Sequence, residues 1–167
     1  MELKFQVQTR IQKPVEDVFD AVYNPGKLSG YFANGGASAP LDAGTTVRWA
    51  FDDNPGQEVI DFPVTVEECV KNVRIVLYWQ GSPGKQNRVE MLFEPVGDDE
   101  TIVKISESGW DENDADLERS YGNCMGWSQM LSALKAYTEY GINLRKGAYT
   151  GVYCKKGEES AAASDAK

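Results

Sequence analysis

Apolar residues recur at three- and four-residue steps over a long stretch near the end of the chain, from Asp116 to Leu144. This spacing places them on one side of a helix, in two neighbouring stripes that form a wider apolar face than an ordinary surface helix has. The stripes consist of Leu117, Tyr121, Cys124, Trp127, Leu131, Leu134 and Thr138, and of Met130, Ala133, Tyr137 and Gly141. We therefore predict a central helix packed against a concave partner. The residues expected to face water are Lys135, Glu139 and Arg145.

Two glycines, Gly122 and Gly126, lie one turn apart inside this predicted helix. Each costs about 1 kcal/mol of helix stability relative to alanine. Two explanations fit that cost: another element approaches the helix backbone closely, or space is left for another molecule.

The N-terminal part of the chain changes its pattern twice. Apolar and polar residues alternate over residues 3–11, which predicts a half-buried strand. Pro14 then opens a helix, and the sequence Asn24-Pro25-Gly26 breaks it. Residues 27–32 indicate a second short helix or a turn, and residues 34–36 a loop.

Alternation with a period of two returns over residues 45–107, where short turns separate successive segments. This pattern predicts five strands in an antiparallel meander. Pro63 falls inside the longest of them, residues 57–70, where we expect a bulge or a bend. An apolar sheet face and an apolar helix face satisfy each other by packing together, so the predicted class is α+β.

The domain organisation follows from the extent of these patterns. We expect a single domain over residues 1–150, because 167 residues suffice for one substantial core. Residues 151–167 have no periodicity and are expected to form a disordered tail.

Composition excludes several classes of function. The net charge of -9 disfavours binding to phosphate backbones, so no nucleic-acid partner is expected. No apolar run is long enough to cross a bilayer and the N-terminus does not read as a signal peptide, so we expect a cytoplasmic protein that is not embedded in a membrane.

Histidine is absent and there are three cysteines, Cys69, Cys124 and Cys154. Without histidine, Ser-His-Asp and Cys-His catalysis are impossible within the chain, and zinc and iron sites lose their commonest ligand. The widely spaced cysteines do not indicate a disulfide framework, and buried, inert thiols are favoured over reactive ones. We expect no metal, no cofactor and no catalytic residue.

Acidic residues gather between Trp110 and Glu118, at the start of the predicted central helix. A calcium loop is one interpretation, but the central glycine and ligand spacing of an EF-hand are missing. The favoured interpretation is a helix N-terminus, capped by Asn113 or Asp114 and followed by acids that suit the helix dipole.

Several residues, in consistent order over roughly residues 3–144, carry a resemblance to a known family. They are Pro14, Val18, Phe19, Ala21, Val22, Asn24-Pro25, Leu28, Tyr31-Phe32, Val66-Glu67-Glu68, Arg74-Ile75, Trp79, Gly109, Gly126-Trp127, Leu131 and Leu134. The chain resembles homologues of the activator of the heat-shock protein 90 ATPase, within the START-like, helix-grip superfamily. Phe19 departs from the tryptophan that many members carry, and the residues after Leu144 extend past the usual domain end.

The resemblance implies a helix-grip fold. In this fold a curved antiparallel sheet of about six strands wraps around the long C-terminal helix, and two short helices follow the first strand. It also implies a cavity between sheet and helix. Members of the superfamily bind apolar small molecules there, some branches are enzymes, and the eukaryotic branch of the family stimulates a chaperone ATPase by protein contact.

The leading hypothesis is non-enzymatic binding of a small hydrophobic ligand, in a carrier, sensor or stress-related role. Glu107 is the expected polar anchor, because it shares a strand face with Val103 and Ile105, although a rim position in water is the alternative. The pocket candidates are Tyr31, Phe32, Trp49, Phe51, Trp79, Met91, Phe93, Ile105, Glu107, Trp127, Met130, Leu131 and Leu134. The alternative to a ligand pocket is that these side chains fill a dry core.

Two other hypotheses belong to different classes. One is a co-chaperone-like module that binds a protein partner and stimulates a chaperone ATPase. The other is an enzyme that uses Glu107, Tyr78 or Asp61 as general acid or base. Tyr78 falls on the opposite strand face from Trp79, so the sequence offers Glu107 no obvious partner.

Overall fold

One antiparallel sheet of seven strands, in the order β1-β7-β6-β5-β4-β3-β2, forms one layer of the protein in a computed structural model that describes residues 1–152. Part of the predicted tail, residues 153–167 with Cys154, lies outside the described residues. The elements in chain order are β1 (Lys4–Ile11), α1 (Val15–Tyr23), α2 (Pro25–Leu28), β2 (Gly36–Ala37), β3 (Thr46–Phe51), β4 (Ile60–Val70), β5 (Arg74–Gln80), β6 (Gln86–Val96), β7 (Glu100–Ser108) and α3 (Asp114–Tyr140).

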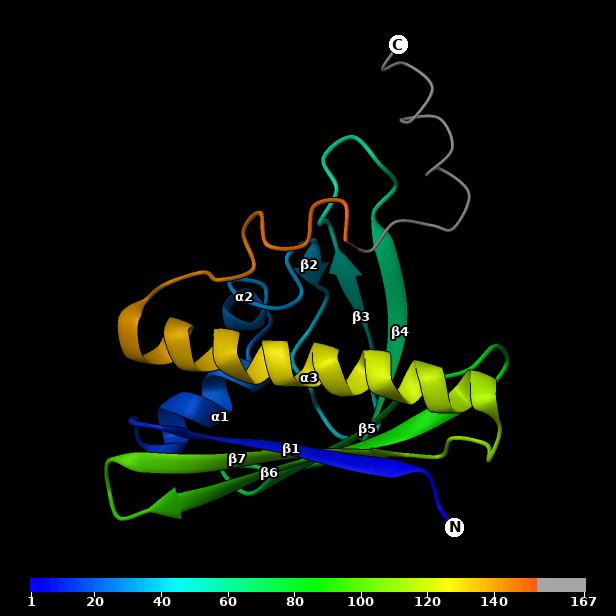
Figure 1. The fold of residues 1–167 in the computed structure, drawn as a ribbon. Helices are drawn as coiled ribbons and strands as arrows, with labels where there is room; N and C mark the ends of the chain where they lie inside the picture. The colour runs from blue at the N-terminus through cyan, green and yellow to red at the C-terminus, as the bar shows by residue number, and fades with distance from the viewer. Residues whose placement is uncertain (153–167) are drawn as a thin grey trace.

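The sheet curves around α3, and α1 and α2 lie beside the C-terminal half of that helix (Figure 1). This arrangement confirms the α+β class and the helix-grip fold. Strand β1 forms one edge of the sheet and pairs with β7, from Lys4 opposite Ser108 to Ile11 opposite Thr101. The sheet has one strand more than expected because the short segment Gly36–Ala37, whose first residue was predicted as loop, pairs with β3.

The two ends of α3 follow capping rules that the sequence displays. The Asn113 side chain accepts a hydrogen bond from the Asp116 N–H at 2.9 Å, which makes Asn113 the N-cap and confirms the helix-start interpretation of the acidic segment. Gly141 ends the helix in the left-handed conformation, with φ 67°. The helix therefore stops before Leu144, and the chain is free to turn away.

The inner face of α3 is apolar only in its second half, where Trp127, Met130, Leu131 and Leu134 are buried. The predicted stripe is wrong in the first half of the helix, because Tyr121 is 64% exposed while Asp116 and Ser120 are buried. Buried polar groups need partners, and Asp116 has them. The Ser82 hydroxyl, the Asp111 N–H and the Arg119 guanidinium hold the pKa of Asp116 below its usual value.

Strand β4 contains the expected irregularity at a different residue. Pro63 lies opposite Arg48 of β3, in a part of β4 that extends past the Thr65–Tyr78 pair with which the β4–β5 pairing begins. Because no β5 residue lies opposite Pro63, the missing N–H of the proline costs no hydrogen bond between β4 and β5. The register shift lies between Val66 and Glu68, so the bulge is separate from the proline.

The two described cysteines, Cys69 and Cys124, are free and partly buried. Burial raises the pKa of the Cys69 thiol above its usual value. A raised pKa lowers the thiolate fraction, which favours the inert role expected from the sequence for Cys69.

Candidate functional site

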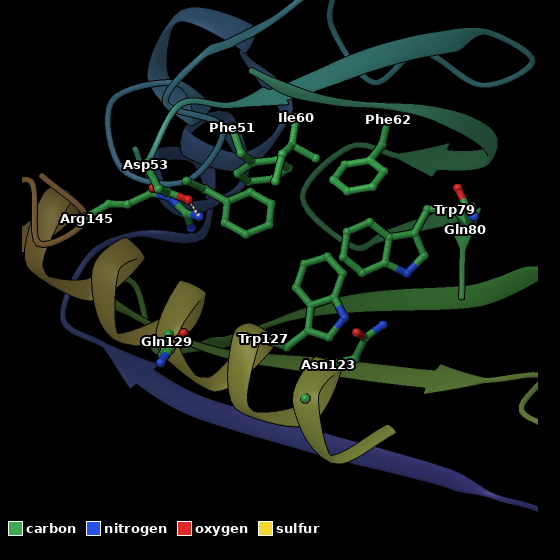
Figure 2. A pocket seen from close by; sticks show the side chains of 13 residues that line it. Phe51, Asp53, Ile60, Phe62, Trp79, Gln80, Asn123, Trp127, Gln129 and Arg145 are labelled. Carbon is green, nitrogen blue, oxygen red and sulfur yellow. Dashed lines mark hydrogen bonds and ion pairs between the residues drawn. The ribbon is translucent and has the colours of Figure 1, made fainter. Parts of the chain in front are cut away.

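A pocket of about 310 Å³ opens between α3 and strands β3, β4 and β5 (Figure 2). Among the described residues, its only charged lining residues are one aspartate and one arginine, and most of the others are aromatic, aliphatic or glycine. The lining consists of Phe32, Phe51, Asp53, Ile60, Phe62, Trp79, Gln80, Gly122, Asn123, Gly126, Trp127, Gln129 and Arg145.

Five aromatic rings form a closed circuit around this pocket, and we call them the aromatic cage: Phe32, Phe51, Phe62, Trp79 and Trp127. Neighbouring ring centroids around the circuit are 5.2, 5.9, 6.4, 4.9 and 5.6 Å apart. Each ring comes from a different part of the chain: the segment after α2, then β3, β4, β5 and α3. Edge-to-face, tilted and stacked contacts at these distances are favourable, so the rings stabilise one another.

The glycine pair of α3 borders the open side of the cage. A Cβ atom built on Gly122 or on Gly126 meets no atom within 4 Å. Close approach of another backbone is therefore the wrong explanation for these glycines. They leave open volume where side chains of almost any other kind would project into the pocket.

Glu107 lies behind the cage wall, and its side chain is fully buried. Its Oε1 atom accepts hydrogen bonds from Trp79 Nε1 at 3.1 Å, Asn87 Nδ2 at 3.0 Å and Asn123 Nδ2 at 2.9 Å. Its Oε2 atom accepts one from Trp127 Nε1 at 2.7 Å. The rim position considered for Glu107 is wrong, and its partners come from β5, β6 and α3.

This carboxylate fixes the orientation of three pocket-lining side chains. Both indole nitrogens and the Asn123 amide nitrogen are directed to Glu107, so the six-membered indole rings lie on the side of Phe51 and Phe62 (Figure 2). An indole N–H only donates, and an ionised carboxylate only accepts. Both oxygens of Glu107 therefore act as hydrogen-bond acceptors for these N–H groups.

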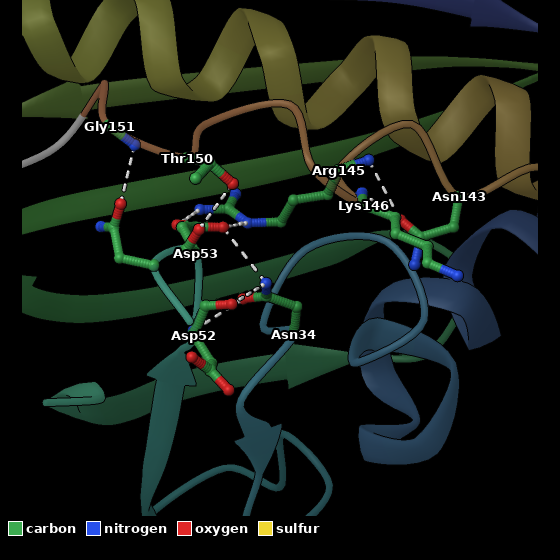
Figure 3. Close-up of polar contacts among 9 residues, drawn as sticks. Asn34, Asp52, Asp53, Asn143, Arg145, Lys146, Thr150 and Gly151 are labelled. Atoms are coloured by element: carbon green, nitrogen blue, oxygen red, sulfur yellow. Dashed lines mark hydrogen bonds and ion pairs between the residues drawn. The ribbon is translucent and has the colours of Figure 1, made fainter. Parts of the chain in front are cut away.

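The chain after α3 turns back and forms one side of the site (Figures 1 and 3). Arg145 donates from Nε to Asp53 Oδ1 at 3.0 Å and from Nη2 to Asp53 Oδ2 at 2.7 Å. The two side chains are only 12% and 9% exposed. The Thr150 hydroxyl donates to the Asp53 carbonyl at 3.1 Å, and the Gly151 N–H donates to Asn54 Oδ1 at 2.8 Å. We call residues 141–152 the C-terminal strap.

Arg145 also stacks on aromatic rings of the site. Its guanidinium carbon lies 4.8 Å from the centroid of Phe51, 4.9 Å from that of Tyr149 and 5.8 Å from that of Phe32. Arg145 and Glu139 were expected in water, and both expectations are wrong. The Glu139 side chain is 4% exposed and accepts hydrogen bonds from Lys135 and the Gln12 N–H.

Replacing Arg145 with alanine is expected to release the C-terminal strap from the β3–β4 connection. We expect amide hydrogen exchange in residues 142–152 to rise by roughly ten- to a hundredfold, because a hydrogen bond to a charged group contributes about 1.5–3 kcal/mol. Exchange in the buried half of α3 is expected to stay unchanged. Hydrogen exchange with mass spectrometry of peptides from both regions makes the measurement.

Arg48→Ala is the matched control, because it removes an exposed ion pair with Asp61 on another part of the sheet. It is expected to leave the strap protected. Equal exchange of the strap in the Arg145→Ala variant and the parent protein would contradict the proposed attachment.

The structure divides the predicted pocket residues into two groups. Those that line the pocket are Phe32, Phe51, Trp79 and Trp127, with Glu107 directly behind them. Those that are packed in the hydrophobic core without lining the pocket are Tyr31, Trp49, Met91, Phe93, Ile105, Met130, Leu131 and Leu134.

Sequence reasoning missed Phe62, Asn123 and Arg145. Phe62 could have been found, because it alternates with Val64 and Val66, which are both buried. Asn123 and Arg145 have no comparable signal, since polar residues in a helix and after a helix are ordinarily solvated.

The other candidate acid–base groups lie away from the pocket lining. Asp61 pairs with Arg48 at 2.8 Å, and both side chains are exposed. The Tyr78 hydroxyl is hydrogen-bonded to Glu67, which raises the pKa of that phenol. Neither group is a hydrogen-bond partner of Glu107 among its four contacts.

The sequence matches the model of one protein family over most of the described elements. The model described as "Activator of Hsp90 ATPase homolog 1-like protein" matches residues 12–139. The chain belongs to this family. The match ends inside α3, so the strap that carries Arg145 lies beyond the matched region of the Activator of Hsp90 ATPase homolog 1-like family. No curated protein matches the sequence at a significant level.

Solved structures share the fold at low sequence identity. The protein SSP2350 from Staphylococcus saprophyticus aligns with a TM-score of 0.70 at 24% identity, over 86% of this chain and 97% of that one. DynU16, from the dynemicin biosynthetic locus, gives 0.69 at 21%, over 86% and 50%. The Aha1 dimer from Colwellia psychrerythraea gives 0.66 at 18%, over 84% and 99%. No helix in the described part of the chain, α3 included, has the apolar length that a membrane span requires.

Proposed function

We propose that the protein binds a small, largely apolar organic molecule in the aromatic cage and acts as a carrier or sensor rather than as a catalyst. The observation that carries this proposal is the open volume beside Gly122 and Gly126. A helix that only filled a dry core would gain stability from alanine at either position. Two helix-destabilising residues facing the same pocket support a role for the empty space.

The lining supports this class of ligand. Small-molecule sites are mostly apolar clefts of about 300–1,000 Å³ with a few polar groups that fix orientation. The pocket volume of about 310 Å³ lies at the small end of that range, which fits a compact ligand. Asn123 supplies a polar group whose orientation Glu107 holds in place.

A neutral fluorophore, N-phenyl-1-naphthylamine, tests whether the cage takes an apolar guest. We expect saturable binding of one molecule per chain, with enhanced probe fluorescence and quenching of tryptophan emission, because Trp79 and Trp127 line the pocket. Fluorescence titration supplies the affinity, and native mass spectrometry supplies the stoichiometry.

Native mass spectrometry of the gently purified protein, before any probe is added, also reveals a co-purified ligand as mass lost on denaturation. The absence of saturable probe binding, together with a clean mass, would overturn the proposed function.

The description of the family supplies a second candidate, stimulation of a chaperone ATPase by protein contact. It makes a different prediction, because the ATPase rate of a purified heat-shock protein 90 would rise on addition of this protein. An unchanged rate would exclude the role for that partner.

A further inference from the structure

We infer that the ligand of the aromatic cage is an organic cation, such as a quaternary or protonated amine with apolar substituents. This inference rests on the proposed function and narrows it to one class of ligand. Two independent observations lead to it: a cation already stacks on the cage, and a buried negative charge lies behind the cage without a cationic partner.

Arg145 shows that the rings of the cage accept a positive charge. Its guanidinium lies 4.8 Å from the centroid of Phe51 and 5.8 Å from that of Phe32. Aromatic faces carry negative electrostatic potential, and a cation within about 6 Å of a ring centroid is attracted to it. Phe62, Trp79 and Trp127 offer further aromatic groups around the same pocket.

The charged residues that line the pocket cancel each other. Asp53 and Arg145 are paired through two hydrogen bonds, so together they contribute no net charge. Within residues 1–152, they are the only carboxylate and the only guanidinium in the lining. An incoming cation therefore does not meet an uncompensated arginine.

In the part of the chain that the structure describes, Glu107 is left as the unbalanced charge of the site. All four of its hydrogen bonds come from neutral indole and amide N–H groups. Buried charges are ordinarily paired, because an uncompensated charge in a medium of low dielectric is costly. A cation in the cage would lie across the two indoles from this carboxylate and would supply the missing opposite charge.

The hydrogen bonds of Glu107 also act on the rings themselves. An indole that donates its N–H to a carboxylate is polarised, and hydrogen-bonded groups in a low dielectric strengthen one another. The added electron density makes the ring faces more negative, which strengthens cation–π attraction for Trp79 and Trp127. The net charge of -9 favours the approach of a cation from solution as well.

A pair of isosteric probes tests the sign of the charge directly. Benzyltrimethylammonium and neopentylbenzene have the same shape, and they differ by a charged nitrogen in place of a carbon. Each is titrated in competition with bound N-phenyl-1-naphthylamine. We expect the cation to bind roughly tenfold or more tightly than the neutral hydrocarbon, because a desolvated cation–π contact favours it.

Variants separate the two sources of that preference. Glu107→Gln removes the charge and is expected to reduce the preference for the cation. Phe62→Leu removes one aromatic face while the site stays apolar. It is expected to weaken binding of the cation more than binding of the hydrocarbon.

Phe93→Leu is the matched control, because Phe93 packs on Phe19 in the core and does not line the pocket. Circular dichroism establishes that each variant is folded, and the Phe62 variant carries the test if Glu107→Gln does not fold.

The outcomes distinguish this inference from the function on which it rests. Equal binding of both probes, or tighter binding of neopentylbenzene, would overturn the cation preference while the pocket function stands. No binding of N-phenyl-1-naphthylamine or of either isostere would overturn the pocket function, and the cation preference with it.

Discussion

Replacement of Glu107 with alanine is expected to lower the free energy of unfolding by about 3–5 kcal/mol, because the Asn87 and Trp127 donors are fully buried and each buried donor left without an acceptor costs about 1–3 kcal/mol. Four N–H groups lose their acceptor at once. Two of them belong to Trp79 and Trp127, whose indole nitrogens can only donate. Urea denaturation followed by circular dichroism measures the change.

A graded series makes this prediction specific. Glu107→Gln keeps one acceptor oxygen but presents an NH₂ group to an indole N–H, so its cost is expected to lie between those of the parent and the alanine variant. Glu94→Ala is the matched control, because it removes a carboxylate on a neighbouring strand that pairs with Lys104 and is 45% exposed. The control is expected to cost less than about 1 kcal/mol. A Glu107→Ala variant as stable as this control would show that the buried hydrogen bonds contribute little.

Replacement of Gly126 with leucine is expected to abolish probe binding without loss of stability. The side chain would project into space in which no atom lies within 4 Å of the new Cβ. Leucine is also a better helix former than glycine, so the free energy of unfolding is expected to be unchanged or higher by up to about 1 kcal/mol. Titration with N-phenyl-1-naphthylamine and urea denaturation measure the two quantities separately.

Few substitutions are expected to remove a function while the fold gains stability, and the combination distinguishes a ligand site from a packing defect. Ser132→Leu is the matched control, because it adds the same side chain to an exposed position of α3. It is expected to leave probe binding intact. Unaltered binding in the Gly126 variant would mean that the probe binds elsewhere.

The fold was predictable because its determinants are local. The alternation of residues 3–11 and 45–107 identifies the strands, Asn113 marks the start of α3, and short turns force neighbouring strands to pair. The end of α3 was predicted at Leu144 with Gly141 inside the helix, but Gly141 caps the helix three residues earlier. The first half of α3 was misread because Tyr121 fits an apolar period. Buried polar partners such as Asp116 override that period, and no local pattern reveals them.

The site was only partly predictable because its parts meet from distant regions of the chain. Single aromatic residues on strand faces could be identified, but not whether they fill a core, as Trp49 and Met91 do, or surround a pocket, as Trp79 does. Glu107 could be singled out from the strand pattern, yet its donors come from three other elements. The pairing of Arg145 with Asp53 joins residues 92 positions apart, beyond the reach of any periodicity argument.

The position of β1 beside β7 determines the order in which the protein can fold during synthesis. Strand β1 cannot pair until β7, which ends at Ser108, has been synthesised. The concave face of the sheet stays uncovered until α3 has also been synthesised. Contacts between such distant residues make folding slow and expose apolar surface in the meantime. The nascent chain therefore exposes this apolar face while the 27 residues of α3 are synthesised, roughly one to five seconds at about 5–20 residues per second.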